Sequence, residues 1–127
     1  MIEGRPLVTG RAEGPALVLD EPLSFWGGID PETGRIVEVG HPQRGEVVTG
    51  RILVMPSGRG SSSSATVLAE SIRLGTGPAG IVLAEVDGII AIGALVAANL
   101  YGVTVPVVVA ERSAYAAIRA GAPLSLG

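Results

Sequence analysis

Short apolar runs alternate with segments of helical periodicity along the second half of the chain. The apolar runs of strand length cover 51–55, 79–84 and 105–109. The segments with helical character cover 62–75, 87–100 and 113–120. Continuous apolar runs of this kind are typical of strands that are covered on both faces. Because strand and helix alternate, we expect parallel β–α–β units in this half.

The first half has a different rhythm, made of short strands and turns. Strands are expected over 7–10 and 16–19, with a turn at Gly14-Pro15 between them, and a half-buried strand is expected over 35–39. Turns are also expected over 30–34 and 41–45, where Pro and Gly occur at turn spacing. The pattern predicts an α/β chain: a β/β/α domain with a strand-rich N-terminal half and a parallel β–α–β C-terminal half.

All three predicted helices carry recognisable ends. Asp87 has the character of an N-cap, and Gly102 follows at the position of a C-cap. Gly75 and Gly121 end the helices before and after it. Glu85 lies just after a buried strand, where α/β sheets often place functional residues. The sequence does not decide whether Glu85 has a functional role or is an ordinary surface residue.

Composition narrows the classes of function. The 127 residues suit one domain, and with 47% hydrophobic but only 3% aromatic residues the core must be aliphatic. A net charge of −3 without a basic cluster argues against nucleic-acid binding. The absence of cysteine excludes disulfides, zinc–thiolate sites and iron–sulfur ligation by this chain. With no secretory signal pattern and no apolar run of membrane-spanning length, we expect a cytoplasmic protein without a membrane partner.

The strongest chemical signal is the turn at 56–64, with the sequence Pro-Ser-Gly-Arg-Gly-Ser-Ser-Ser-Ser, between a predicted strand and a predicted helix. Gly58 and Gly60 permit backbone angles closed to other residues. Arg59 and the serines would then lie at the positive end of a helix, which suits an anion. The turn has no lysine for a Walker-type phosphate loop and no neighbouring histidine or cysteine for a hydrolase triad. An anion-binding turn with a serine base or nucleophile is what these residues indicate.

Other conspicuous residues have less specific interpretations. His41 is the only histidine, and without a second ligand nearby a turn or surface role is favoured over catalysis. Phe25 and Trp26 lie in a glycine-rich loop. They could mark a contact surface or could cap the small core.

Two segments carry a resemblance to a known family. Residues 27–37, Gly-Gly-Ile-Asp-Pro-Glu-Thr-Gly-Arg-Ile-Val, and residues 53–62, Leu-Val-Met-Pro-Ser-Gly-Arg-Gly-Ser-Ser, resemble the small swivelling subunit of the aconitase X group. The similarity extends through 79–83 and 103–108, and it is strongest to the small subunit of archaeal phosphomevalonate dehydratase. The resemblance implies that residues 1–127 form a single swivel domain.

The resemblance also implies a reaction. In this group a large catalytic subunit carries a 4Fe–4S cluster, while the small subunit, which binds no cofactor, closes over a small anionic substrate and supplies a serine base. For the archaeal enzyme the reaction is dehydration of (R)-5-phosphomevalonate to trans-anhydromevalonate 5-phosphate in the mevalonate pathway of isoprenoid synthesis. The chain would then act as a heterodimer or higher assembly and be inactive alone.

The residues of the turn divide into roles under this hypothesis. We predict Ser62 as the proton acceptor, because Ser61 is better placed as the helix cap and its oxygen is then engaged. Arg59 should bind the carboxylate or phosphate of the substrate, with Gly60, Ser61 and Ser63 also in contact with it. Ser61 and Ser63 stay open as alternatives for the base. The helix N-terminus and the guanidinium together could stabilise an alkoxide by ~1–3 kcal/mol.

Three rival functions are compatible with parts of this pattern. A related dehydratase that acts on cis-3-hydroxy-L-proline uses a similar subunit. A swivelling phosphohistidine carrier shares the β/β/α layout, but it needs a histidine in the glycine–serine turn, and His41 is distant in sequence. The third is a non-catalytic partner subunit, in which every serine could be replaced without loss of activity.

Overall fold

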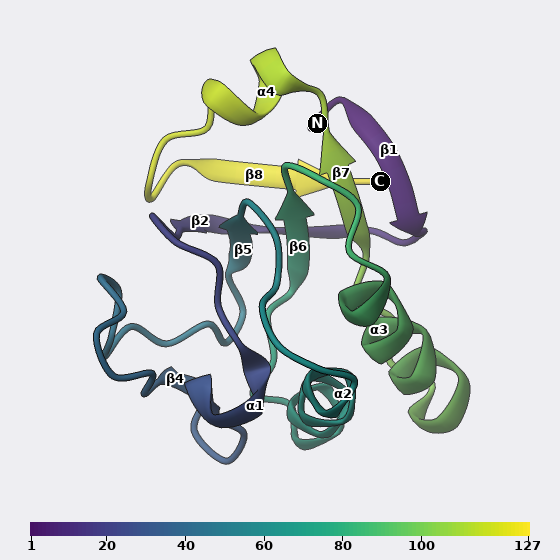
Figure 1. Ribbon diagram of the computed structural model, residues 1–127. Helices are drawn as coiled ribbons and strands as arrows, with labels where there is room; N and C mark the ends of the chain where they lie inside the picture. The colour runs from purple at the N-terminus through teal and green to yellow at the C-terminus, as the bar shows by residue number, and fades with distance from the viewer.

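A computed structural model describes all residues, 1–127, and its centre is one curled six-stranded sheet of mixed direction (Figure 1). The strand order is β1-β7-β6-β5-β2-β8. The four inner strands run parallel to one another, whereas β1 pairs antiparallel with β7 and β8 pairs antiparallel with β2. The bounds are β1 Gly4–Val8, β2 Ala12–Val18, β5 Ile52–Met55, β6 Gly80–Leu83, β7 Val107–Ala110 and β8 Pro123–Leu126.

The central strands are apolar throughout because both of their faces are covered. Along β5, Leu53 and Met55 belong to the larger core, and Ile52 and Val54 belong to a second core on the other face. All four side chains are fully buried. The prediction of doubly covered parallel strands is therefore confirmed.

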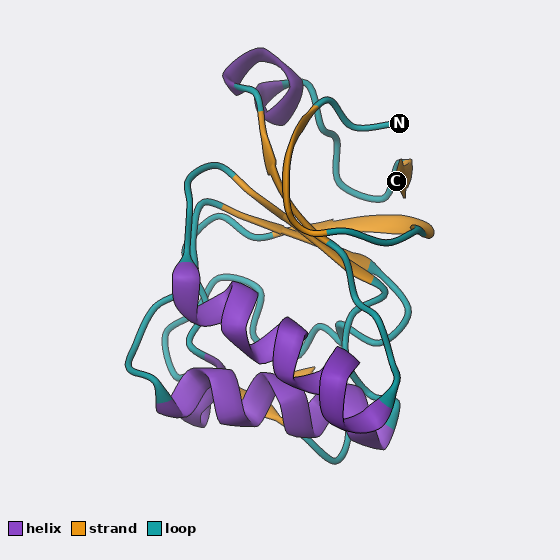
Figure 2. Cartoon of the chain, turned by 90° about the vertical axis from the view of Figure 1, so that its right-hand side faces the viewer, coloured by secondary structure: helices purple, strands orange, loops and turns teal.

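Two long helices cover one face of the sheet, and a short helix lies beyond the other (Figure 2). The long helices are α2, Ser63–Leu74, and α3, Gly88–Tyr101, which pack against each other. Gly93 allows their close approach, because a Cβ at that position would lie 2.9 Å from the carbonyl oxygen of Ala65. The short helix is α4, Arg112–Ala116. None of the helices combines the length and the apolarity that crossing a bilayer requires.

The segment between β2 and β5 forms an irregular layer that packs on α2. It contains the short helical turn α1, Phe25–Gly28, and a small hairpin of β3, Ile29–Asp30, and β4, Arg35–Ile36. The predicted turn at 30–34 closes this hairpin: the Asp30 carboxylate accepts from the Glu32 N–H at 2.9 Å, and Gly34 has a φ of +75°.

The expected turn at Gly14-Pro15 is wrong, because both residues lie inside β2. Residues 12–15 pair with β8 and residues 16–18 pair with β5, so the strand changes partner at this point. Proline is tolerated where a strand lies at a sheet edge or pairing is interrupted. The Gly-Pro pair is typical of a turn, but here pairing with β8 near the C-terminus keeps these residues in a strand.

Several other bounds differ from the sequence prediction. The strand expected over 35–39 is only two residues long, and the helix expected over 113–120 ends at Ala116. The first strand begins at Gly4 rather than at residue 7, and β8 was not expected. The two halves of the chain are also joined in one sheet, because β1 and β2 pair with strands of the C-terminal half.

Candidate functional site

The serine turn begins where β5 ends and leads directly into α2. Ser62 already has helical angles, φ −57° and ψ −21°, and its side chain makes no capping bond. The hydroxyl oxygen of Ser61 accepts from the Ser63 N–H at 3.3 Å, which is the contact expected of an N-cap side chain. The prediction that Ser61 caps the helix is therefore confirmed, and the helix begins within one residue of the predicted position.

The serine side chains differ in exposure and in partners. Ser61 and Ser62 are exposed and Ser63 is half-buried, whereas Ser64 is 2% exposed and its hydroxyl donates to the carbonyl oxygen of Arg59 at 3.4 Å. The hydroxyl of Ser62 has no hydrogen-bond partner within the chain. Of the two exposed hydroxyls, only that of Ser62 is unengaged.

The backbone of the turn presents free donors at the same place. The N–H groups of Gly60, Ser61 and Ser62 donate to no acceptor in the chain. The N–H of Ser63 donates to the Ser61 hydroxyl, and those of Ser64 and Ala65 donate to the Ser61 and Ser62 carbonyls. Gly60 has a φ of +110°, which favours glycine. Free N–H groups at a helix N-terminus form a cradle for an anion.

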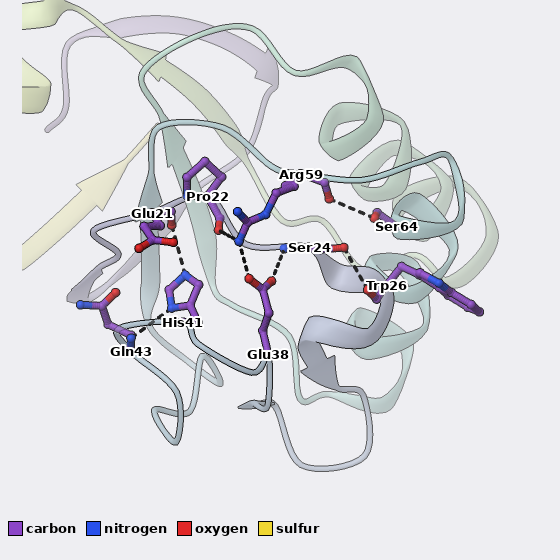
Figure 3. A network of polar contacts seen from close by, with 9 residues as sticks. All are labelled: Glu21, Pro22, Ser24, Trp26, Glu38, His41, Gln43, Arg59 and Ser64. Atoms are coloured by element: carbon purple, nitrogen blue, oxygen red, sulfur yellow. Dashed lines mark hydrogen bonds and ion pairs between the residues drawn. The ribbon is translucent and has the colours of Figure 1, made fainter.

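Arg59 directly precedes this cradle in the chain, and its guanidinium points toward Pro22 and Glu38, away from Ser64 (Figure 3). Its Nη2 donates to the carbonyl oxygen of Pro22 at 3.0 Å and pairs with the carboxylate of Glu38. The other carboxylate oxygen of Glu38 accepts from the Ser24 N–H at 3.1 Å. The Arg59 side chain is 47% exposed, so the remaining guanidinium nitrogens can reach a ligand.

Asp87 connects the turn to the next helix. One carboxylate oxygen accepts from the N–H groups of Ile89 and Ile90 at 3.0 and 3.2 Å, which confirms the predicted N-cap of α3. The other oxygen accepts from the Gly58 N–H at 2.8 Å. The same side chain therefore caps one helix and holds the turn that leads into another.

The remaining sequence candidates lie outside the turn. His41 is in a turn, as favoured, but it is only 5% exposed: its Nδ1 accepts from the Gln43 N–H at 3.0 Å, so its Nε2–H donates to the Glu21 carbonyl at 3.2 Å. Phe25 is fully buried and Trp26 is 64% exposed, so the pair divides between core and surface. Glu85 is exposed at the end of β6, and its side chain makes no hydrogen bond.

Sequence reasoning missed three contacts that hold the turn. Arg59 binds the Glu38 carboxylate and the Pro22 carbonyl across 21 and 37 residues, and Gly58 binds the second Asp87 oxygen across 29 residues. No local motif marks these contacts. Glu38 lies in the segment that the sequence predicts as a half-buried strand, which is not a signal for an ion pair with Arg59. Only the path of the chain brings these residues to the turn.

Residues 59–62 of the turn are exposed to solvent. A hollow of about 370 Å³ is formed near the two chain ends, and its lining residues include Met1, Pro6, Arg11, Val108 and Gly127. None of the residues of the serine turn lines it. A substrate at the turn would therefore need a second surface to enclose it.

Comparisons with known proteins converge on one family. A family model of the aconitase X swivel domain matches residues 1–126. A cis-3-hydroxy-L-proline dehydratase from Pseudomonas aeruginosa is 44% identical over 107 residues, and the match covers 84% of this chain but only 18% of that protein. The phosphomevalonate dehydratase small subunit of Pyrococcus furiosus is 43% identical over 96 residues, with 76% of this chain and 72% of that subunit covered.

Solved structures agree with these sequence matches. The crystal structure of Thermococcus kodakaraensis aconitase X in its holo form superposes with a TM-score of 0.85 at 33% identity, and the match covers 98% of this chain and 88% of that one. A second structure, determined by solution NMR, gives a TM-score of 0.82 at 38% identity over 96% of this chain.

Proposed function

The chain belongs to the aconitase X swivel-domain family, and on this basis we propose that it is the small subunit of a dehydratase that acts on (R)-5-phosphomevalonate. The observation that carries the proposal is the serine turn. An unengaged Ser62 hydroxyl and three free backbone N–H groups lie together at the start of α2, and Arg59 directly precedes them in the chain. These are the groups that a proton abstraction next to an anionic substrate requires.

Ser62 is the proposed proton acceptor. A serine hydroxyl is a very weak acid, so it can act as a base only where its alkoxide is stabilised. The N-terminus of α2 and the Arg59 charge supply ~1–3 kcal/mol, and closure against a second surface adds to this by excluding water. Ser61 is less suited because its oxygen already accepts from Ser63, and Ser63 is the alternative on the half-buried side.

The anionic groups of the substrate are proposed to bind the rest of the turn. Phosphomevalonate carries a carboxylate and a phosphate, and the free N–H groups of Gly60, Ser61 and Ser62 together with Arg59 are donors for one of them. Ser63 flanks the same position. This match between charge and donors favours a substrate that carries an anionic group.

The partner is proposed to be a large subunit that holds the reacting part of the substrate. Iron–sulfur clusters are held by cysteine thiolates, and this chain has no cysteine. Its residues therefore do not fit as ligands of such a cluster, and we assign the cluster to the large subunit. The roles given to this chain are binding, enclosure and proton abstraction.

A second substrate is favoured by one observation. The match to the hydroxyproline dehydratase of Pseudomonas aeruginosa covers 84% of this chain at 44% identity. This identity is as high as that to the small subunit of Pyrococcus furiosus. Cis-3-hydroxy-L-proline is therefore the alternative substrate of the same turn.

The test is anaerobic co-expression with the large subunit encoded in the same genome, followed by dehydration assays on both substrates. We expect turnover of 5-phosphomevalonate by the pair and by neither chain alone. Turnover of cis-3-hydroxy-L-proline instead would keep the dehydratase and change its substrate. If the two chains do not associate, the subunit hypothesis is wrong.

A further inference from the structure

Three segments distant in sequence meet at the side chain of Arg59 (Figure 3). The Arg59 N–H donates to the Leu23 carbonyl at 3.1 Å, and its Nη2 donates to the Pro22 carbonyl at 3.0 Å. The same Nη2 pairs with Glu38, which comes from the segment after β4. Main chain and side chain of Arg59 are thus both attached to the layer that precedes β5.

Glu38 is held in place by contacts other than Arg59. Its N–H donates to the Gly28 carbonyl at 3.2 Å, and its Oε1 accepts from the Ser24 N–H at 3.1 Å. The carboxylate also lies against the Gly28 backbone, because a Cβ at Gly28 would come within 2.9 Å of Oε1. The Glu38 side chain is only 20% exposed. The carboxylate is therefore a fixed point to which the longer Arg59 side chain is attached.

The contacts also decide which donors of Arg59 are free. A guanidinium can bind an anion with two parallel bonds through either of two edges, and both edges include Nη2. The two hydrogens of Nη2 are occupied by Pro22 and Glu38. Nε and Nη1 have no partner in the chain, but alone they do not form a parallel pair. In this arrangement an anion can receive the charge of Arg59 and single hydrogen bonds, but not a two-bond fork.

Building on the proposed function, we infer that Glu38 is the positioning residue of Arg59. It fixes Nη2 against the layer that precedes β5, so that Nε and Nη1 are the donors left for an anion held at the turn. The anion then completes its contacts with the backbone N–H groups of Gly60, Ser61 and Ser62. Without Glu38 the guanidinium keeps its charge but loses its position, so substrate binding weakens although Arg59 is present.

The first experiment uses the full chain alone and does not depend on activity. Arginine side-chain NMR is recorded for wild type, Glu38→Gln and the control Glu46→Gln, which removes a different ion pair with Arg51. Gln keeps an oxygen for the Ser24 N–H but removes the charge. We expect the Arg59 side-chain N–H signals to shift and to exchange with water about tenfold faster in Glu38→Gln, a loss of roughly 1.4 kcal/mol of protection. Glu46→Gln should leave the Arg59 signals unchanged.

The second experiment uses the complex with the large subunit. We expect Glu38→Gln to raise KM for 5-phosphomevalonate about tenfold while kcat changes less than about threefold, because ground-state binding is lost. Glu38→Asp should recover part of this loss. Arg59→Ala should raise KM at least as much, and Glu38→Gln added to Arg59→Ala should have little further effect, since both act through one group.

The outcomes separate this inference from the proposed function. Unchanged Arg59 signals in Glu38→Gln, or a KM within twofold of wild type while Arg59→Ala raises it, would overturn the positioning role alone. Equal KM effects of Glu46→Gln and Glu38→Gln would also overturn it, since they indicate general destabilisation. If the complex has no dehydratase activity, the proposed function fails, and the NMR comparison still decides whether Glu38 positions Arg59.

Discussion

The four consecutive serines at 61–64 are identical residues, but their surroundings differ. Successive residues at the start of a helix point about 100° apart, because an α-helix has 3.6 residues per turn. Ser64 is thereby turned into the core and Ser62 to the open surface, and Ser61 precedes the helix and caps it. Chemical role is decided here by position along the first turn.

Ser62→Ala tests the role of the free hydroxyl. We expect kcat of the complex to fall at least about 100-fold, because a positioned base contributes this much or more. The free energy of unfolding of the chain should stay within about 0.5 kcal/mol of wild type, since the side chain is exposed and unbonded. A loss of kcat below tenfold, measured in the same assay, would remove Ser62 from the role.

His41→Ala tests the assignment of the histidine to structure. The change removes two part-buried hydrogen bonds, to the Gln43 N–H and the Glu21 carbonyl, and each contributes about 0.5–1.5 kcal/mol. The free energy of unfolding should therefore fall by about 1–3 kcal/mol. Urea denaturation measures this. Gln43→Ala is the control: its side chain bonds Asp20 on the exposed surface, and the cost should be about 0.5 kcal/mol or less. Equal costs would contradict the assignment.

At the scale of elements, α3 and the serine turn share one anchor. The Asp87 carboxylate satisfies two N–H groups at the start of α3 and the Gly58 N–H before the turn. A helix start and a loop are therefore coupled, although 29 residues separate Gly58 from Asp87. Loss of this side chain should loosen both.

Asp87→Ala measures that coupling. An N-cap contributes about 1 kcal/mol and a hydrogen bond to a charged group about 1.5–3 kcal/mol, so we expect a total loss of roughly 2–4 kcal/mol of unfolding free energy. Amide exchange at Gly58 should accelerate. Glu111→Ala is the control, because Glu111 precedes α4 without a side-chain capping bond. If amide exchange at Gly58 is unaltered, the hydrogen bond between the Gly58 N–H and Asp87 does not stabilise the turn.

The α2–α3 contact predicts opposite effects for two glycines of one helix. A Cβ at Gly93 would lie 2.9 Å from the Ala65 carbonyl oxygen, whereas a Cβ at Gly88 meets nothing within 4 Å. Gly93→Ala should therefore lower the unfolding free energy by about 1–3 kcal/mol through overpacking. Gly88→Ala should raise it by up to about 1 kcal/mol through reduced freedom of the unfolded chain. Thermal denaturation of both variants measures the two changes in stability. If Gly93→Ala is instead more stable than wild type, α2 and α3 can move apart without an energetic cost.

At the scale of the whole molecule, the sheet joins the two ends of the chain. Strand β2 pairs with β8 along its first part and with β5 along its last part, so the C-terminal strand extends the sheet that the inner parallel strands begin. Leu126 of β8 is 3% exposed and packs in the second core. The fold is therefore completed by residues at the far end of the sequence.

Leu126→Ala tests this closure. Removing a buried leucine side chain should lower the unfolding free energy by about 2–5 kcal/mol. Leu100→Ala is the control, because Leu100 is 69% exposed on α3 and its loss should cost less than about 0.5 kcal/mol. Denaturant titration of both variants makes the comparison. Similar values would mean that β8 is not an integral part of the core.

Much of the layout could be predicted from local sequence. The apolar runs gave the inner strands, the spacing of apolar residues gave α2 and α3, and the caps at Ser61, Asp87 and Gly102 were found because capping chemistry is local. The predictions that were wrong concern segments whose structure depends on strands distant in sequence. The Gly14-Pro15 pair read as a turn, and β8 had no signal, because both depend on pairing across more than 100 residues.

The sequence by itself determined the serine turn and its place at a helix start, because both follow from neighbouring residues, and composition alone determined the absence of thiol ligands. Only the tertiary structure decided which hydroxyl is free, that Glu38 holds Arg59, and which side of the uniformly apolar α3 is covered. Side-chain partners and burial depend on the path of the whole chain. The residues that form the turn are local in sequence, whereas the residues that position it come from the whole fold.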